Sequence, residues 1–149
     1  MPQFQSFNFR DRFIRHRNFE GMLSRKQDGG PEADFSFAVV DRGAGRISLR
    51  SANFPDRFLR HRDFRIMLEK SAGPSDQLFR QDSTFFLEPG LAASNGVSFR
   101  SFNFPDRFVR HRNFQLFLDP RDSPNLAADA TFFRVQLIDH GPELNPVDD

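Results

Sequence analysis

Residues 53–64 read Asn-Phe-Pro-Asp-Arg-Phe-Leu-Arg-His-Arg-Asp-Phe, and this stretch decides the fold because the chain contains it three times. Residues 8–19 and 103–114 repeat it with few changes. The pattern Asp-Arg-Phe-x-Arg-His-Arg is intact in all three copies, although the positions around it have drifted. A repeat of this kind indicates one structural unit used three times, so the chain is organised in thirds.

A second, weaker match closes each copy, where an Asp is followed closely by Phe. These acidic residues are Asp34, Asp82 and Asp129, which lie 18, 21 and 18 residues after His16, His61 and His111. The stretches between each His and its Asp are rich in Gly, Pro, Ser and Asp, which is typical of turns and loops. Surface loops tolerate this variation in length.

Short apolar and β-branched runs alternate with turn residues at intervals of roughly ten residues, which is typical of strands. In the second copy we expect a lead-in strand over 45–50, a turn over 53–56, and strands over 58–62, 64–68 and 84–87. Helical periodicity is poor throughout. Four strands in each of three copies predict about twelve strands.

The three copies are expected to close into a ring. An open solenoid needs capping repeats, for which three unmodified copies leave no room, and closure also removes exposed sheet edges. Residues 2–5 and 132–138 resemble the two halves of one strand pair, so we expect the ends of the chain to meet. The prediction is an all-β fold, specifically a β-trefoil with pseudo-threefold symmetry. It places one domain over 1–149, with subdomains at approximately 1–44, 45–94 and 95–149.

Composition and charge exclude several classes of function. The 149 residues include no Cys, which removes disulfide scaffolds, Cys-ligated zinc and thiol nucleophiles. The 21 Lys and Arg nearly balance the 20 Asp and Glu, so no bulk field attracts nucleic acid or anionic lipid. No apolar run approaches the roughly 18 residues of a membrane span, and residues 1–5 lack the features of a signal peptide. We expect a soluble monomer that needs no cofactor, either a trimmed secreted module or an intracellular protein.

The repeated Phe and Asp side chains are expected to be structural. Phe9, Phe13, Phe19 and their counterparts fit a core around the axis, because each buried ring removes about 150–250 Å² from water. Asp11 lies one residue before Arg12 and four before Arg15, and its counterparts in the other copies have the same spacing. A carboxylate held by the forked donors of Arg would pin the turn.

The repeated histidines are the candidate site. Each His shares a strand face with the apolar residue two positions earlier, as His61 does with Leu59, so its polar tip is expected at the margin of the core. That position suits either a buried hydrogen-bond network or three equivalent pockets. A neutral imidazole and a carboxylate together offer the donor and acceptors that hold adjacent sugar hydroxyls, so the recurring Asp favours pockets.

Asn-x-Pro-Asp-Arg-Phe-x-Arg-His at 53–61 and 103–111, followed by Asp-x-Thr-Phe at 82–85 and 129–132, resembles the arabinofuranosidase-B-type carbohydrate-binding domain (AbfB, carbohydrate-binding module family 42). The resemblance covers essentially the whole chain and implies a secreted β-trefoil module of the kind usually attached to hemicellulases. It implies binding of α-L-arabinofuranosyl side chains of arabinoxylan or arabinan in up to three pockets. The sugar ligands it implies are His16 with Asp34, His61 with Asp82, and His111 with Asp129.

This chain departs from the family pattern at several positions. Arg10 stands where the family has Pro, and Phe35-Ser36 replaces a small residue and Thr. The residue after each His is often aromatic in the family but is Arg in all three copies here, at positions 17, 62 and 112. Arg hydrogen bonds are therefore expected to weaken or replace stacking on a sugar ring.

Three classes of function stay open, of which non-catalytic sugar binding leads. Glycoside hydrolysis needs two carboxylates flanking one bond, whereas each copy offers one retained Asp beside a His, so no catalytic residue is expected. A β-trefoil lectin for another glycan, or a scaffold that binds protein through the three arginines, is the alternative, because fold alone does not fix the ligand. No metal site is expected, since three symmetry-related histidines would lie too far apart to share one ion.

Overall fold

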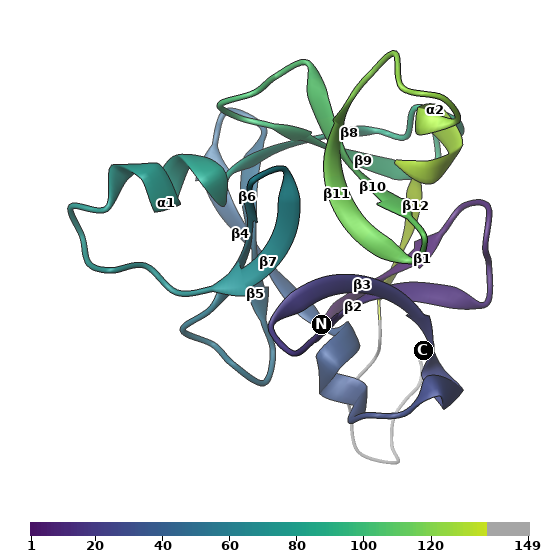
Figure 1. The fold of residues 1–149 in the computed structure, drawn as a ribbon, viewed down its shortest axis with the longest axis horizontal. Helices are drawn as coiled ribbons and strands as arrows, with labels where there is room; N and C mark the ends of the chain where they lie inside the picture. The colour runs from purple at the N-terminus through teal and green to yellow at the C-terminus, as the bar shows by residue number, and fades with distance from the viewer. Residues whose placement is uncertain (137–149) are drawn as a thin grey trace, which may run out of the picture.

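Twelve strands joined by antiparallel pairing form the computed structural model, which describes residues 1–136 (Figure 1). The first third contains β1 (Pro2–Ser6), β2 (Arg12–Arg17), β3 (Glu20–Arg25) and β4 (Phe37–Gly43). The second contains β5 (Arg46–Ser51), β6 (Phe58–Arg62), β7 (Arg65–Glu69) and β8 (Phe85–Pro89). The third contains β9 (Val97–Ser101), β10 (Arg107–Arg112), β11 (Gln115–Pro120) and β12 (Phe132–Gln136). The predicted all-β fold with four strands per copy, a β-trefoil, is confirmed.

Three hairpins, β2–β3, β6–β7 and β10–β11, gather around the pseudo-threefold axis at the centre of Figure 1. Strands β3, β7 and β11 pair with one another around this axis. Each hairpin tip is also bound by a neighbouring hairpin, because the Phe19 carbonyl accepts a 2.8 Å hydrogen bond from the Leu68 amide. The same bond recurs from Leu118 to Phe64 and from Leu23 to Phe114. Closure of the ring therefore satisfies backbone groups that an open array would leave unpaired.

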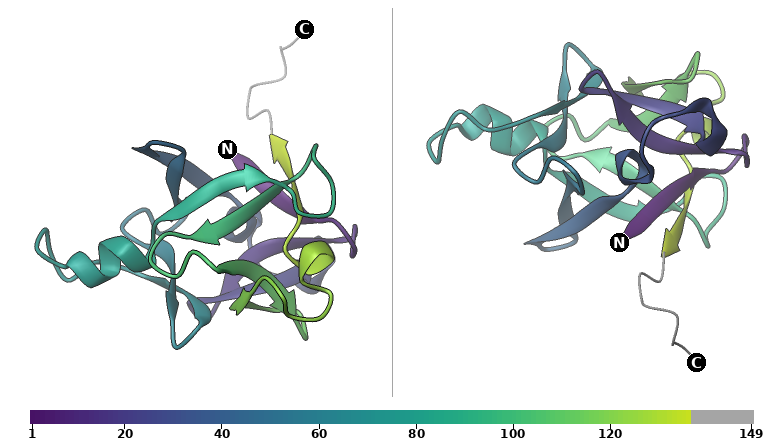
Figure 2. Two further views of the ribbon diagram at one scale, coloured as in Figure 1. Left: turned by 90° about the horizontal axis from the view of Figure 1, so that it is seen from above. Right: turned by 90° about the horizontal axis from the view of Figure 1, so that it is seen from below.

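The two ends of the described chain meet, as predicted. Strand β1 pairs with β12 in a register that sets Pro2 against Gln136 and Ser6 against Phe132, and Figure 2 shows the two strands side by side. The last two positions of the expected terminal strand lie outside the described residues, as does His140, to which the sequence assigned no role. The first lobe is thus completed by residues from the last.

Short helical turns occupy the stretches that the sequence marked as loops. They are the 3₁₀ turns η1 (Lys26–Asp28) and η2 (Glu32–Phe35) and the helices α1 (Gln77–Asp82) and α2 (Leu126–Asp129). Elements of three to six residues carry too little periodicity to be recognised from sequence. Asp76 starts α1 by accepting a 3.1 Å hydrogen bond from the Phe79 amide, a typical N-cap.

The core is built mainly from aliphatic residues of the hairpins and from Phe residues of the first and last strands of the lobes. Its members are Phe4, Ile14, Leu23, Phe37, Ile47, Leu49, Leu59, Ile66, Leu68, Phe85, Phe99, Val109, Leu116, Leu118 and Phe132. The expectation that Phe9 and its counterparts join this core is wrong, since Phe9, Phe54 and Phe104 are 41%, 37% and 40% exposed. These rings belong to turns beyond the strand ends, so they cannot reach the axis.

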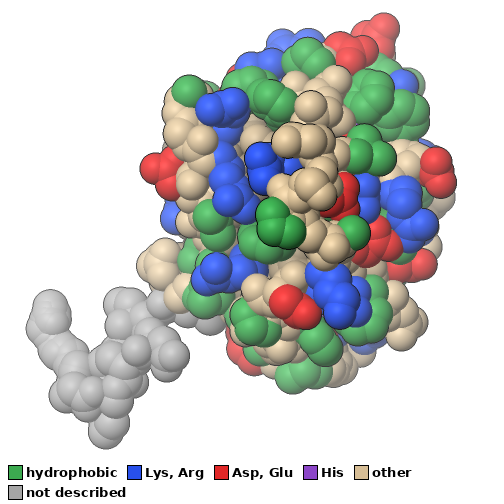
Figure 3. Space-filling model, turned by 90° about the vertical axis from the view of Figure 1, so that its left-hand side faces the viewer, with side chains coloured by type: hydrophobic (Ala, Val, Ile, Leu, Met, Phe, Trp, Pro, Cys, Tyr) green, Lys and Arg blue, Asp and Glu red, His purple; other side chains and the backbone are tan. Residues whose placement is uncertain are grey.

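The surface mixes charges of both signs. Figure 3 shows Lys and Arg side chains interspersed with Asp and Glu and with apolar groups on the side of the molecule that carries α1. Within residues 1–136, no helix is long and apolar enough to cross a membrane.

Phe99 joins the lead-in strands of two lobes, so its removal should destabilise the whole ring. Its ring is fully buried, 5.2 Å from the Phe4 ring and 6.2 Å from the Phe132 ring. Phe99→Ala should lower the free energy of unfolding by about 3–5 kcal/mol. Phe104→Ala, which truncates an exposed ring, should cost only about 1 kcal/mol. Urea denaturation measures both, and equal losses would contradict this account of the core.

Candidate functional site

The structure brings each predicted His together with its predicted Asp. His Nε2 lies 3.5 Å from the Asp Oδ1 atom in the first and third lobes and 3.3 Å in the second. The pairs are His16 with Asp34, His61 with Asp82, and His111 with Asp129. All three imidazoles are about 4% exposed, which places them at the margin of the core as their strand positions predict.

An Asn from the following copy of the repeat completes each cluster. His16 Nε2 lies 2.9 Å from Asn53 Oδ1, and Asn53 Nδ2 donates to Asp34 Oδ1 at 2.8 Å. Asn103 makes the equivalent bonds to the second pair and Asn8 to the third, at distances of 2.7–2.8 Å. Each site is therefore shared between two lobes, and Asn8 closes the circle by joining the start of the chain to the third lobe.

The hydrogen-bond network fixes the protonated nitrogen of each His. Asn53 uses Nδ2 to donate to the carboxylate, so its Oδ1 is the acceptor, and Ser51 Oγ also donates to this atom at 3.0 Å. His16 Nε2 must then carry a proton. The imidazole thus orients the Asn and does not accept a hydrogen bond at Nε2. The Ser51 hydroxyl in turn accepts from the Phe54 amide, which ties the cluster to the turn.

A buried Arg holds the other side of each carboxylate. Arg15, which is 1% exposed, donates from Nη2 to Asp34 Oδ2 at 2.7 Å, and its Nε donates to the His16 carbonyl. The other lobes repeat this arrangement with Arg60 and Asp82, and with Arg110 and Asp129. Each carboxylate is therefore desolvated but matched by a charged donor and an amide donor.

The expected partner of Arg15 was wrong. Asp11 and its counterparts are exposed, and the arginine pairs instead with the Asp that closes the copy. A spacing of four residues brings side chains together in a helix, but in a strand it separates them by about 13 Å. The retained Asp11 therefore belongs to the turn and not to the buried ion pair.

The sequence pattern places each of these acidic residues at the start of the last strand of its copy. In the structure they lie in the helical turns that precede this strand. Asp34 lies within η2, and Asp82 and Asp129 end α1 and α2. In the first lobe Gly30 passes close above the ion pair, with φ at +89°. A Cβ atom there would lie 2.5 Å from Arg15 Nη2 and 3.0 Å from Asp34 Oδ2, so only glycine fits both the backbone conformation and the space.

Exposed aromatic rings form a rim around each cluster. The Phe54 ring meets the His16 ring at 5.6 Å and the Phe19 ring at 5.2 Å, both edge to face. Phe104 and Phe9 repeat these contacts over the second and third clusters. The sequence had assigned these rings to the core, and their place at the site explains why they are retained despite exposure.

The hairpin tips present the second ring of each rim in a strained backbone conformation. Asn18 and Phe19 both have positive φ, 54° and 61°, as a two-residue hairpin turn of this type requires. Asn tolerates this region, whereas a bulky residue such as Phe is an outlier there. Arg57 stacks over the Phe19 ring at 4.0 Å, which accounts for the first Arg of the repeated motif.

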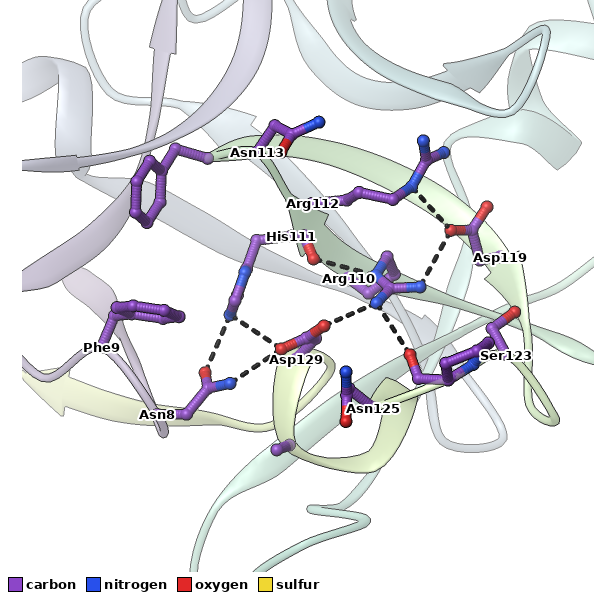
Figure 4. Close-up of a pocket in the computed structure, with 13 residues that line it drawn as sticks. Asn8, Phe9, Arg110, His111, Arg112, Asn113, Asp119, Ser123, Asn125 and Asp129 are labelled. Atoms are coloured by element: carbon purple, nitrogen blue, oxygen red, sulfur yellow. Dashed lines mark hydrogen bonds and ion pairs between the residues drawn. The ribbon is translucent and has the colours of Figure 1, made fainter.

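Cavities open over the first and third clusters. The third, drawn in Figure 4, has a volume of about 820 Å³, and the Asp129 carboxylate and His111 lie at its base beside Asn8. The first has a volume of about 580 Å³ and is lined by the equivalent residues, with Phe54 at its edge. In the second cluster the Asp82 side chain is more deeply buried, 7% exposed against 12% and 13% in the other two.

The arginine after each His stands beside its cluster. Arg17 and Arg112 line the first and third cavities. Arg112 Nε lies 3.4 Å from Asp119, and Arg62 pairs with Glu69, whereas Arg17 donates to the Asp28 carbonyl. Across residues 1–136, no group of three His, Asp or Glu side chains is arranged to hold a metal ion.

Comparison with known proteins identifies the family. The family described as the alpha-L-arabinofuranosidase B (ABFB) domain matches residues 2–134. The chain belongs to this family. No curated protein sequence matches this AbfB domain.

Solved structures share the fold of this AbfB domain. A point mutant of a GH54 α-L-arabinofuranosidase soaked with 4-nitrophenyl α-L-arabinofuranoside matches 89% of the chain with 23% identity and a TM-score of 0.76. An arabinofuranosidase complexed with arabinofuranosyl-α-1,2-xylobiose matches 89% with 22% identity and a TM-score of 0.78. The AbfB domain spans 30% of each of these enzymes. A designed threefold-symmetric protein, ThreeFoil, matches 91% of the chain and 98% of its own length, with 8% identity and a TM-score of 0.69.

Removing the buried Arg of one cluster should destabilise the AbfB domain far more than removing its exposed neighbour. Arg15→Met leaves the Asp34 carboxylate without its charged partner, and we expect a loss of about 3–5 kcal/mol in the free energy of unfolding. Arg17→Met, two residues away and exposed, should change it by about 0.5 kcal/mol or less. Denaturation curves of the two variants decide the matter, and similar losses would show that the ion pair is not structural.

His111 should make stability depend on pH below neutrality. Burial lowers the pKa of His111 below its ordinary value of 6.5, with Asp129 opposing the shift and Arg110 adding to it. The folded state therefore favours the neutral imidazole, and this contribution is complete above pH 6.5 and is lost as the pH falls toward the lowered pKa. The slope from this one group cannot exceed about 1.4 kcal/mol per pH unit.

The matched variant is His111→Gln, which keeps an N–H donor but does not titrate. Denaturation between pH 7.5 and 5.5 should show a steeper loss of stability in the wild type than in the variant. Carboxylates such as Glu32, whose pKa is lowered from 4.5 by hydrogen bonds from Lys26 and Gln3, act at lower pH and are common to both proteins. Parallel curves over this range would refute the assignment.

Proposed function

We propose that this AbfB domain binds α-L-arabinofuranosyl side chains of a polysaccharide such as arabinoxylan or arabinan. The observation that carries the proposal is the cluster of His, Asn and Asp at the base of the cavities over the first and third lobes. The sugar ligands are His16 with Asp34 and His111 with Asp129, and His61 with Asp82 forms a third, more buried site. An arabinofuranosidase of similar fold solved with arabinofuranosyl-xylobiose supports this choice of sugar.

The cluster has the chemistry to hold a pair of sugar hydroxyls. The Asp carboxylate is oriented by the Arg and by the Asn, so its remaining lone pairs accept hydrogen bonds in fixed directions. The Asn has a second N–H to donate to an adjacent hydroxyl. All of these groups are positioned before a ligand arrives, which lowers the entropic cost of binding.

The aromatic rim supplies the apolar part of the recognition. Phe54 and Phe9 present exposed ring surface beside the polar base of the first and third cavities. The C–H groups of a sugar ring pack on such surfaces while its hydroxyls face the carboxylate. Cavities of about 580 and 820 Å³ are large enough for a monosaccharide that projects from a polymer chain.

The domain acts in this proposal as a non-catalytic module joined to a glycoside hydrolase outside the cell. Asp34 is engaged by Arg15, and in the third cavity Asp119 and Asp129 are both engaged by the same Arg110. Hydrolysis instead needs two carboxylates on either side of a bond, one as acid and one as base or nucleophile. The solved arabinofuranosidases are about three times as long as the matched region, which is consistent with a separate catalytic part. Weak single sites on one body reinforce one another on a branched polymer through avidity.

Truncating the rim of the two open sites should weaken binding without disturbing the buried clusters. We expect the double variant Phe9→Ala/Phe54→Ala to lose about tenfold in affinity for methyl α-L-arabinofuranoside at each altered site, because each variant loses about 1.4 kcal/mol of ring contact. Retardation in gels containing arabinoxylan should fall correspondingly. The matched control is Phe104→Ala at the more buried site, which should leave most of the retardation.

Two results would count against the assignment. Unchanged retardation of the double variant would remove the cavities over the first and third lobes from the binding surface. Equal retardation of the wild type by unsubstituted xylan, or by glycans without arabinofuranose on an array, would instead favour a β-trefoil lectin of different specificity.

A further inference from the structure

A separate cavity of about 320 Å³ lies between the β4–β5 hairpin and α1, and none of the residues that line it belongs to the three clusters. Its lining includes Arg42, Arg46 and Arg80 together with the amides of Gln77 and Gln81 and the ring of Phe102. No Asp or Glu is among the residues that line it.

The three guanidinium groups in this cavity are held by neutral acceptors. Arg42 Nε donates to the Ser48 hydroxyl at 3.0 Å, Arg46 Nε to the Gly43 carbonyl at 2.9 Å, and Arg80 to the Pro74 carbonyl at 3.0 Å. Among residues 1–136 none of the three forms an ion pair, whereas the buried Arg of each cluster is matched by Asp. In a chain with 21 basic and 20 acidic residues, this is a local excess of positive charge.

The three arginines are not repeated at the corresponding positions of the next lobe. Arg42 lies five residues after the start of β4, Arg46 lies five residues before the end of β5, and Arg80 lies two residues before the Asp of its cluster. The corresponding positions of the next lobe hold Gly90, Gly96 and Ala127. The next lobe joins its strands by the longer loop 90–96 and has a shorter helical turn, so the three arginines belong to the second lobe alone.

We propose that this cavity binds the carboxylate of a uronic acid residue in an acidic polysaccharide. The planar fork of Arg matches a carboxylate with two parallel hydrogen bonds, so one of the three arginines balances its charge and a second adds further donors. The Gln77 and Gln81 amides donate to and accept from neighbouring hydroxyls, and Phe102 offers an apolar face to the sugar ring. The volume suits one monosaccharide unit.

This site goes beyond the proposed arabinofuranose sites because it recognises a negatively charged sugar, whereas those clusters bind a neutral one. It would let the domain prefer polymers that carry acidic sugars as well as arabinose. Because the interaction is between exposed charges, salt should weaken it, whereas binding to a neutral sugar should be insensitive to salt.

The test uses glucuronate as the probe, with xylose as a neutral sugar of similar size. NMR titration at low salt should shift the amide signals of Gln77 and Gln81 with glucuronate but not with xylose. The double variant Arg42→Gln/Arg80→Gln should weaken glucuronate binding at least tenfold and keep its melting temperature. The control Arg134→Gln removes the same charge from an exposed position on β12 and should change binding less than twofold.

The Phe9→Ala/Phe54→Ala variant should bind glucuronate like the wild type, so the outcome does not depend on the arabinofuranose sites. An absence of shifts at tens of millimolar glucuronate would overturn the proposal. An equal loss of glucuronate affinity in Arg134→Gln would show that the affinity depends on the net charge of the domain and would contradict a specific site in this cavity. Inorganic sulfate that competes with glucuronate at the same concentration would show that the cavity takes any anion and would overturn its assignment to a uronic acid.

Discussion

A carboxylate withdrawn from water at each junction between lobes is the constraint on which the rest of the structure depends. Asp34 is desolvated by the turn that carries it, so it must be matched by donors on every accessible side. Its own lobe supplies Arg15 and the next lobe supplies Asn53. The same contacts therefore close the ring of lobes and shape the base of the site, which makes the fold and the candidate site inseparable in energetic terms.

The apolar core and the polar clusters stabilise the fold in different ways and differ in the substitutions they tolerate. Aliphatic residues and buried Phe rings such as Phe99 give the ring its stability through burial, which is tolerant of exact residue identity, as the change from Ile14 to Leu59 to Val109 shows. The clusters tolerate no such change, because Arg, His and Asn each meet a partner of defined hydrogen-bonding character. This difference explains why the core position of Ile14 drifts among aliphatic residues while the Arg, His and Asn of the clusters are retained.

The sequence predicts the fold well because strand periodicity is visible within short stretches of the chain and the same motif occurs in all three copies. The resemblance to the AbfB family pairs each His with an Asp, and the recurrence of both residues at similar spacing agrees with it. The contribution of Asn53 was missed although an Asn opens every copy of the repeat. Asn53 belongs to the second copy but contacts His16 of the first, and the order of residues along the chain does not show contacts between copies. Retention of Asn8 and its two counterparts in all copies was the available signal. The exposed Phe54 was misplaced because hydrophobicity alone does not separate a rim from a core.

Departures from symmetry distinguish the three lobes where the retained motif does not. The arginine after each His is paired with Glu69 in the second lobe and with Asp119 in the third, whereas within residues 1–136 Arg17 forms no ion pair and donates to the Asp28 carbonyl. The first site therefore presents a net positive edge beside its carboxylate, while the third presents a nearly neutral one. The backbone also differs, because Asp34 lies in a 3₁₀ turn and Asp129 ends an α-helix, so charge and local shape both distinguish the two sites. Each lobe thus serves as a control for the others, and residues that differ between lobes without disturbing the fold are the ones free to set ligand preference.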